Sequence, residues 1–323
     1  MIQIVEQLVR QKLNLNNITL KLMPTGTGRF STTYFIETSP GHVDLVIRIA
    51  PPDDMLLLFY EKRMMRQEPA LHRLIRKKTD IPIPTIITYD FSRSHIDRDY
   101  LIMNRMGGRS LSEMWIQLNQ QQINCALKEL GGYIAKLHTI TADKYGYIGA
   151  HHPMEPQTNW HDAFALMWEM MLDDCVTCGI YSDQEKSLGM KIWQEYHHIF
   201  DFNTPATLCH MDLWIENVLV DNEGHVTCLF DFDRACFGDI ENEFAVAEYC
   251  GLTTDAFWDG YGTRPRQTKE WAIRRWFYLL YEHQKYIVIS VSERRNDINR
   301  AKRYAAECIH SMENFARTGI PQF

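Results

Sequence analysis

The chain has 323 residues, of which 45% are hydrophobic and 23% are charged, and its formal net charge is −7. This length and apolar content allow a large buried core, most naturally divided between two lobes. No apolar run approaches the roughly 18 residues of a membrane span. The N-terminus has an early acid, Glu6, and lacks the apolar core of a signal peptide, so we expect a cytoplasmic protein without membrane association.

The first third of the chain is predicted to form an antiparallel sheet with helices. The strands are expected over residues 18–23, 32–38, 43–50, 85–90 and 99–104. The helices are expected over residues 2–13, Asp53–Gln67 and Pro69–Lys78. We place the first lobe at residues 1–106, and Gly107 with Gly108 marks a flexible crossing to the next lobe.

Residues 107–323 are predicted to form a second, mainly helical lobe. The helices are expected over residues 121–140, 160–178, 183–200, 267–292 and 297–317. In the first of them, apolar residues from Leu127 to Leu137 recur every three or four positions, which is the spacing of a buried helix face. The expected fold class is therefore α+β, with two lobes.

The eight cysteines show no regular framework. Cys175 and Cys178 have the spacing of a metal-ligand pair, but no second such pair completes the four ligands of a structural zinc. Free thiols in a reducing compartment are the expected state.

The most informative pattern is His210-x-Asp212-x4-Asn217, followed by Asp231-Phe232-Asp233. Each part follows or precedes a short apolar run, so the oxygen-bearing side chains fall on two adjacent loops. Such a set can orient a substrate hydroxyl and hold Mg²⁺ on the phosphates of a nucleotide. The pattern predicts Asp212 as the residue that accepts the hydroxyl proton, and Asn217 and Asp231 as metal ligands. His210 is expected to brace the loop backbone.

These residues resemble the aminoglycoside phosphotransferase and choline kinase family, which has a protein-kinase-like fold. The segment from Asp231 to Ala245 looks most like the hygromycin-phosphotransferase type, and amicoumacin kinases look like the same branch. Upstream features occur in the order of the family, so the resemblance covers roughly residues 20 to 250. It implies a kinase that uses ATP or GTP with Mg²⁺.

The resemblance also implies a set of nucleotide-binding residues. They are Gly26, Thr27, Gly28, Ser31, Thr32, Arg48, Glu68, Met103, Asn104 and Met106. Arg48 stands where protein kinases have a lysine, and an arginine keeps the charge and can bind phosphate oxygens with two N–H groups. Pro69 follows Glu68 and places it at the start of a helix. Glu61 remains the alternative partner of Arg48.

Charge points to the class of acceptor. Residues 151–260 contain 21 acidic residues and three basic ones, a formal charge of −18, whereas the rest of the chain carries +11. Clustered carboxylates attract cations and repel nucleic acids, although an acidic face can also serve solubility alone. The candidate acceptor-binding residues are Trp214, Asp162, Glu169, Asp173, Asp174, Glu241 and Glu243. Asp233 and Asp239 are expected to brace the metal-binding loop.

We therefore predict a kinase that phosphorylates a hydroxyl of a small, cationic, amine-bearing compound such as an antibiotic, as a monomer or a homodimer. A metabolic kinase for choline, homoserine or a sugar is the alternative within enzymes. A catalytically inactive nucleotide-binding pseudokinase is the alternative from another class. A pseudokinase has no need to keep Asp212, which argues against it.

Overall fold

The computed structural model of the chain describes residues 2–14, 18–22, 30–39, 42–147, 149–292 and 295–322. These residues form two compact units, which are described separately. Unit 1 consists of Met1–Asp54, Arg63–Ala126 and Ile215–Asp233, and unit 2 of Met55–Lys62, Leu127–Trp214 and Arg234–Phe323. Unit 1 thus extends past residue 106, where the sequence places the end of the first lobe. The division into lobes at residues 106 and 107 stays a prediction.

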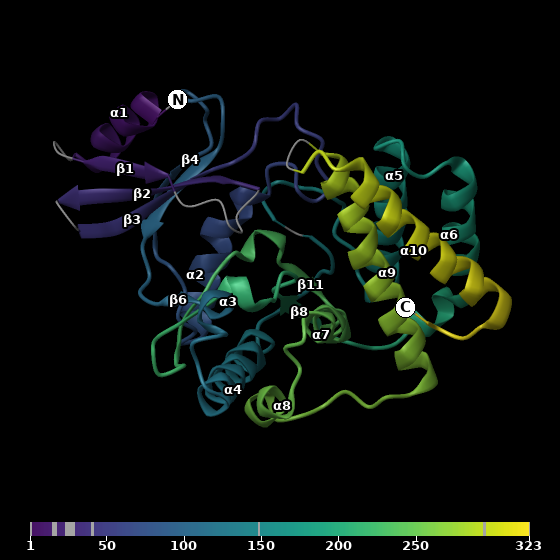
Figure 1. Cartoon of the computed structure of the whole chain (residues 1–323). Helices are drawn as coiled ribbons and strands as arrows, with labels where there is room; N and C mark the ends of the chain where they lie inside the picture. The colour runs from purple at the N-terminus through teal and green to yellow at the C-terminus, as the bar shows by residue number, and fades with distance from the viewer. Residues whose placement is uncertain are drawn as a thin grey trace. The chain divides into compact units, whose positions relative to one another are not determined.

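Unit 1 is built around a five-stranded antiparallel sheet with the strand order β1-β2-β3-β5-β4 (Figure 1). The strands are β1 (Thr19–Leu22), β2 (Thr32–Ser39), β3 (His42–Ile49), β4 (Ile86–Asp90) and β5 (Tyr100–Asn104). All five predicted strands are confirmed. Strand β3 lies between β2 and β5, where Arg48 pairs with Thr33 on one side and Leu101 on the other.

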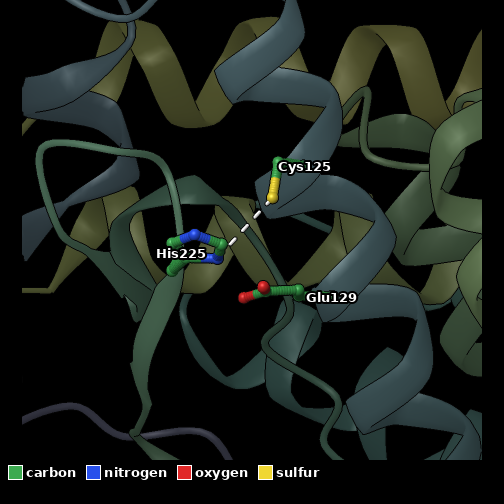
Figure 2. Close-up of side chains that lie close together, drawn as sticks. All are labelled: Cys125, Glu129 and His225. Carbon is green, nitrogen blue, oxygen red and sulfur yellow. Dashed lines mark hydrogen bonds between the residues drawn. The ribbon is translucent and has the colours of Figure 1, made fainter.

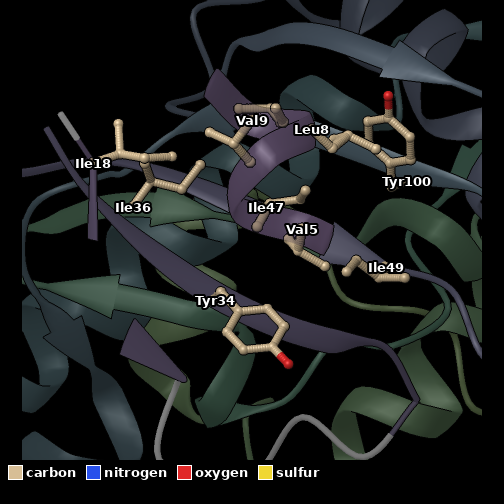
Figure 3. Close-up of a cluster of buried hydrophobic side chains, with 10 residues drawn as sticks. Val5, Leu8, Val9, Ile18, Tyr34, Ile36, Ile47, Ile49 and Tyr100 are labelled. Carbon is tan, nitrogen blue, oxygen red and sulfur yellow. The ribbon is translucent and has the colours of Figure 1, made fainter. Parts of the chain in front are cut away.

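Helix α1 (Ile2–Leu13) covers part of this sheet, and Figure 3 shows the contact. Val5, Leu8 and Val9 stand three or four residues apart, and they pack in one cluster with Ile36 of β2 and Ile47 of β3. All of these side chains are buried. Fully burying three such side chains stabilises the unit by roughly 5 kcal/mol before the entropy cost of ordering them. The predicted helix over residues 2–13 is confirmed.

The helix predicted over Asp53–Gln67 is wrong. Only Met64–Gln67 forms a short 3₁₀ helix (η1), which leads into α2 (Glu68–Lys78). Arg63 has a left-handed φ of 61°, which a continuous helix does not tolerate. The apolar run before it belongs to unit 2, where Tyr60 is buried and its ring stacks on Tyr147 with centroids 4.9 Å apart. Packing against distant residues overrides the local preference for a helix.

Unit 1 also contains a small sheet with the order β10-β9-β6. Its strands are β6 (Arg109–Ser110), β9 (Val218–Val220) and β10 (Val226–Leu229). The same unit holds α3 (Leu111–Met114), the start of α4 (Gln120–Leu137), the 3₁₀ turn η3 (Ile215–Asn217) and the first two residues of the 3₁₀ turn η4 (Phe232–Arg234). Gly108 enters β6 with φ +97°, and a Cβ there would lie 2.5 Å from Thr227 Oγ1. The turn therefore requires glycine.

Unit 2 is mainly helical. Its helices are α5 (Trp160–Thr177), α6 (Asp183–Tyr196) with the 3₁₀ turn η2 (His197–Phe200), α7 (Ile240–Tyr249), α8 (Asp255–Tyr261), α9 (Lys269–Val291) and α10 (Ile298–Thr318). Helix α9 is central and packs against α5, α7 and α10 (Figure 1). The long helices confirm the predictions, whereas α7 and α8 were not predicted. The α+β fold class is confirmed.

A short sheet in unit 2 with the order β11-β8-β7 leads into the candidate site. It consists of β7 (Thr141–Ala142), β8 (Ala206–Cys209) and β11 (Cys236–Gly238). Strand β8 is fully buried and ends at Cys209, so His210 and Asp212 follow directly on a loop. Helix α7 begins just after β11 and supports this loop through hydrogen bonds from Glu243.

Across the described ranges, no helix is long and apolar enough to cross a membrane. The eight cysteines are free thiols. The Sγ atoms of Cys175 and Cys178 each donate to a backbone carbonyl, of Gln284 at 3.7 Å and of Cys175 at 3.2 Å. In unit 1, Cys125 on α4 makes a 3.7 Å hydrogen bond with Nδ1 of His225, as Figure 2 shows. We assign these thiols a packing role.

Candidate functional site

In unit 1, Arg48 lies at the centre of a group of carboxylates. Its Nη1 is 2.9 Å from Glu68 Oε2, and its Nη2 is 2.7 Å from Asp231 Oδ1 and 3.1 Å from Asp233 Oδ2. Burial lowers the pKa of the guanidinium, but the carboxylates, Asp231 first, raise it well above its ordinary value. The partner of Arg48 is thus Glu68. The alternative, Glu61, accepts the backbone N–H of Leu58 within unit 2.

Glu68 is the first residue of α2, with Pro69 next to it, as the sequence predicted. It is 1% exposed, so its carboxylate and the guanidinium of Arg48 form a buried pair. A buried Arg–carboxylate pair with two hydrogen bonds has a fixed direction. The pair therefore sets where the second edge of the Arg48 guanidinium points, which is toward Asp231.

The β9–β10 hairpin brings Asn217 and Asp231 to the same end of the small sheet. Asn217 directly precedes β9, and Asp231 follows β10 after Phe230. The backbone N–H of Phe230 donates to the carbonyl of Asn217 at 3.2 Å, which joins the two loops. Asp231 has a left-handed φ of 69°, a conformation that aspartate adopts more readily than most residues. The predicted metal ligands therefore lie on neighbouring loops of one unit.

The expected phosphate-binding loop is described only at its end. Gly26, Thr27 and Gly28 lie outside the described residues. Ser31 and Thr32 stand at the start of β2, and within the described ranges the buried Ser31 Oγ has no hydrogen-bond partner. A hydroxyl in that position is able to bind a phosphate oxygen.

The expected base-binding residues follow β5. Met103 is buried in a cluster with Ala50, Met65 and Leu101, so its side chain has a packing role. The backbone N–H of Asn104 donates to the carbonyl of Thr85 at 3.1 Å, and its side-chain Nδ2 lies 3.3 Å from the sulfur of Met106. The N–H of Asn104 is therefore not available to a base edge. A role of the remaining backbone groups up to Met106 stays a prediction.

In unit 2, Asp212 is held by an arginine. Arg234 Nη1 donates to Asp212 Oδ1 at 2.7 Å, and its Nη2 donates to Glu282 Oε2 at 3.0 Å. Lys285 also pairs with Glu282. Burial raises the pKa of Asp212, but Arg234 and Lys285 lower it more, so the pKa lies below its ordinary value. The carboxylate is therefore ionised at neutral pH and fixed in direction.

The backbone of this loop is held from beneath by Glu243. Its two carboxylate oxygens accept the backbone N–H groups of His210 and, at 3.0 Å, of Met211. His210 Nδ1 in turn accepts the N–H of Asp212 at 3.2 Å, which agrees with the bracing role predicted for this histidine. Met211 has a φ of 62°, which costs about 1–2 kcal/mol for a residue with a side chain. The hydrogen bonds to Glu243 offset that strain.

The prediction that Glu243 binds the acceptor is therefore wrong. The residue is fully buried, and burial raises its pKa, but His138 and His210 lower it more, so the pKa lies below its ordinary value. Nε2 of His138, the residue directly after α4, lies 3.7 Å from the Glu243 carboxylate. The sequence did not reveal this because an acidic residue in the negatively charged stretch looks the same whether it faces solvent or a backbone loop.

Replacing Glu243 with alanine is expected to destabilise the protein by about 3 kcal/mol, because two buried N–H groups lose their acceptor. Chemical denaturation of the variant measures this loss. Glu248→Gln, on the same helix but in an exposed pair with Arg275, is the matched control and should cost less than about 0.5 kcal/mol. Unchanged stability of Glu243→Ala, with loss of acceptor binding alone, would restore the original prediction.

The other predicted acceptor carboxylates contact partners within unit 2. Asp162 lies 2.8 Å from His161, Asp173 lies 2.5 Å from Lys186, and Glu241 lies 2.8 Å from Arg274. Asp174 accepts the backbone N–H of Phe59 at 2.7 Å, and burial raises its pKa to about 6. An amine at any of these positions competes with a contact that the protein already makes.

The two remaining candidates and the two bracing residues are placed as follows. Glu169 is exposed on α5, and Trp214 is half-buried two residues after Asp212. Asp233 binds Arg48 and its carbonyl accepts from the side chain of Gln67, whereas Asp239 caps α7 and accepts from the hydroxyl of Tyr278 at 2.7 Å. The bracing roles of Asp233 and Asp239 agree with these contacts.

Sequence reasoning missed Arg234, Glu282 and Lys285. Arg234 is one of only three basic residues between positions 151 and 260, and this rarity marked it as a partner for a carboxylate. Glu282 and Lys285 stand three residues apart within the long apolar helix α9, and both are buried. Buried charges of opposite sign at that spacing indicate an internal ion pair.

Comparisons with known proteins place this geometry in context. A model of the phosphotransferase enzyme family (APH) matches residues 22–277. Hygromycin-B 4-O-kinase of Escherichia coli is 25% identical over 178 residues, which are 51% of this chain and 47% of that enzyme. The chain thus matches about half the length of this curated relative.

Solved structures give a similar result. Aminoglycoside phosphotransferase APH(4)-Ia, as a thermostable mutant in a ternary complex with AMP-PNP and hygromycin B, has a TM-score of 0.65 at 18% identity, with 98% of this chain and 99% of that chain covered. The gentamicin complex of APH(2″)-IIa has a TM-score of 0.65 at 15% identity, with 94% and 95% covered. A putative fructosamine-3-kinase from Haemophilus somnus 129PT has a TM-score of 0.65 at 17% identity, with 95% and 97% covered. At these identities the likeness establishes the fold.

Proposed function

Because the chain belongs to the phosphotransferase enzyme family (APH), we propose that it transfers the γ-phosphoryl group of ATP or GTP to a hydroxyl of a small, amine-bearing molecule. The predicted family and its protein-kinase-like α+β fold are confirmed. The observation that best supports the activity is the Asp212 carboxylate, which is ionised and held in one direction by Arg234.

In this proposal Asp212 accepts a hydrogen bond from the acceptor hydroxyl and turns its oxygen toward the γ-phosphorus. Because phosphoryl transfer has a loose transition state, correct orientation contributes more than base strength. A low pKa is therefore no handicap. Arg234 and the loop held by Glu243 keep the carboxylate in place. The side chain of Asp212 therefore needs little reorganisation during the reaction.

The residues of unit 1 fit a nucleotide with Mg²⁺. Asn217 and Asp231 offer an amide and a carboxylate oxygen from neighbouring loops, which are the ligands that Mg²⁺ prefers. When bound, the metal ion neutralises the charge on the phosphate oxygens. Arg48, fixed by Glu68 at Nη1, would bind phosphate oxygens with N–H groups that Glu68 does not hold.

The amine-bearing acceptor is supported by the formal charge of −18 between residues 151 and 260. A carboxylate-rich surface raises the local concentration of cations before they bind. Hygromycin-B 4-O-kinase and the gentamicin-bound APH(2″)-IIa are similar to this chain, and we extend their type of acceptor to it as the first class to test. An antibiotic is one member of that class.

Nucleotide turnover against a panel of acceptors tests the proposal. The panel contains polycationic antibiotics, amino alcohols with a single amine, and neutral sugars, each with ATP or GTP and Mg²⁺. We expect turnover to rise by at least about tenfold with an amine-bearing acceptor over the neutral ones, and to fall as salt screens the attraction. Turnover with neutral sugars alone would assign the chain to the metabolic alternative. Nucleotide binding without turnover on any acceptor would favour a pseudokinase.

A further inference from the structure

The carboxylate of Asp231 would have to bind Mg²⁺, but in the structure it is already paired with Arg48. As a metal ligand it must present its oxygens to Mg²⁺, yet in the structure its Oδ1 lies 2.7 Å from Arg48 Nη2. Its side chain is 30% exposed, so a metal ion can reach it, whereas the side chain of Arg48 is only 10% exposed. When Asp231 turns to a metal ion, the guanidinium loses a close carboxylate in a place that water reaches poorly. Glu68 stays at Nη1, but a buried guanidinium whose Nη2 lost its only carboxylate would be destabilised.

Asp233 contacts the same nitrogen of Arg48 as Asp231 does. Its Oδ2 lies 3.1 Å from Arg48 Nη2, the nitrogen that also contacts Asp231. The Asp233 side chain is 5% exposed, and its backbone carbonyl accepts a hydrogen bond from the side chain of Gln67, directly before α2. Asp233 is thus held by the same helix start that carries Glu68. Its carboxylate is therefore less accessible to a ligand in solvent than that of Asp231.

We propose that Asp233 is a positioning residue that keeps Arg48 paired while Asp231 exchanges the arginine for Mg²⁺. Glu68 holds one nitrogen of the guanidinium, and Asp233 holds the other. The arginine therefore stays in place for the phosphates, and Asp231 is released to the metal at low cost. This inference rests on the proposed function, since it takes Asp231 as a metal ligand.

A guanidinium suits this exchange better than the ammonium group of a lysine. The guanidinium offers two terminal nitrogens in a rigid plane, so it binds Glu68 and Asp233 at the same time from different edges. A single ammonium group has one centre of charge. In this chain the arginine at position 48 and the aspartate at position 233 therefore act together in keeping the guanidinium paired.

Asp233→Asn tests the proposal through nucleotide binding, measured by calorimetry with ATP at increasing MgCl₂ and, separately, with ATP in EDTA. We expect the Mg²⁺ concentration for half-maximal enhancement of ATP binding to rise by about tenfold, because Asp231 is then the only carboxylate at Nη2 of Arg48. The affinity for ATP in EDTA should stay the same or increase, since the variant removes a negative charge near the phosphates. A higher Mg²⁺ requirement without weaker ATP binding in EDTA distinguishes positioning from a loss of structure.

Two further variants complete the test. Asp99→Asn is the matched control, because Asp99 is a fully buried aspartate of unit 1 that pairs with Arg66 and Arg93, and its loss should leave the Mg²⁺ dependence unchanged. Arg48→Lys should raise the Mg²⁺ requirement as Asp233→Asn does, and it serves if the latter fails to fold.

Equal weakening of ATP binding with and without Mg²⁺ in Asp233→Asn, or no change in either, would overturn the inference while leaving the proposed function intact. Failure of the proposed metal site is recognised separately. If Asp231→Asn keeps the wild-type Mg²⁺ dependence, the metal assignment itself is wrong, and the inference falls with it.

Discussion

Replacement of Asp212 with asparagine is expected to lower kcat by about 10²- to 10⁴-fold, the range for loss of a proton-accepting group. The asparagine has nearly the same shape but no charge, and its amide offers a weaker acceptor to the substrate hydroxyl. KM for the nucleotide should change less than threefold or so, because the residue acts on the acceptor and not on nucleotide binding. Steady-state kinetics with the best acceptor of the panel measures both quantities.

The control for this experiment is Asp255→Asn. Asp255 is also an aspartate of unit 2 with an ion pair, to Arg264, but it is exposed at the start of α8. It should retain wild-type kcat. Since Asp212 also pairs with Arg234, the melting temperature of Asp212→Asn must be recorded, so that a loss of folded protein is not taken for a loss of catalysis. An Asp212→Asn protein that is folded and fully active would show that another group accepts the proton.

The second large effect is expected for Asp231→Asn, which should reduce turnover by about 10³-fold or more and abolish the enhancement of ATP binding by Mg²⁺. The variant removes the charged ligand from the proposed metal site, and the metal carries much of the charge stabilisation in phosphoryl transfer. Stability should change little or increase, because Arg48 keeps Glu68 and Asp233 as partners. Calorimetry with ATP and MgCl₂, together with a turnover assay, gives both results.

Asp221→Asn is the matched control for that variant. Asp221 lies at the other end of the β9–β10 hairpin, where its carboxylate accepts the backbone N–H of His225 at 2.9 Å. Its replacement perturbs the same hairpin without touching the proposed metal ligands. Were Asp221→Asn to lose the Mg²⁺ response as fully as Asp231→Asn, the effect would come from the hairpin fold and not from metal binding.

The fold was predictable from the sequence where local pattern and final environment agree. The long helices and the five strands of unit 1 have regular apolar spacing, and each buries the face that this spacing defines. The segment from Met55 to Tyr60 has no such agreement. Its apolar residues are contiguous, and those at positions 57–60 are buried as part of unit 2 although the neighbouring sequence belongs to unit 1. Composition alone does not indicate that this segment belongs to the other unit.

The short helices were missed for another reason. Helix α7 has ten residues and α8 has seven, so neither shows enough repeats for a period to stand out. Their start signals were nevertheless present, since Asp239 caps α7 and Thr254 caps α8 through side-chain hydrogen bonds. A search for caps before short apolar runs would have found both.

For the site, the sequence singled out the residues of the motif, and their catalytic and metal-binding roles stay predictions. Asn217, Asp231 and Asp212 were recognised from spacing, and Glu68 was chosen over Glu61 only by the structure. Roles that depend on burial stayed hidden, as for Glu243, because a carboxylate bonded to a backbone loop has no signature in one sequence. The ion pair between Asp212 and Arg234 was likewise not predictable, since the two residues are 22 positions apart.

The position of a divalent ion in the nucleotide complex tests the account most directly. Anomalous diffraction from a crystal grown with Mn²⁺ and a non-hydrolysable ATP analogue locates the ion without ambiguity. We predict Mn²⁺ bound by oxygens of Asn217 and Asp231 beside the phosphates, with the Asp212 carboxylate facing the γ-phosphate. Manganese bound elsewhere, with Asp231 still paired to Arg48, would contradict it.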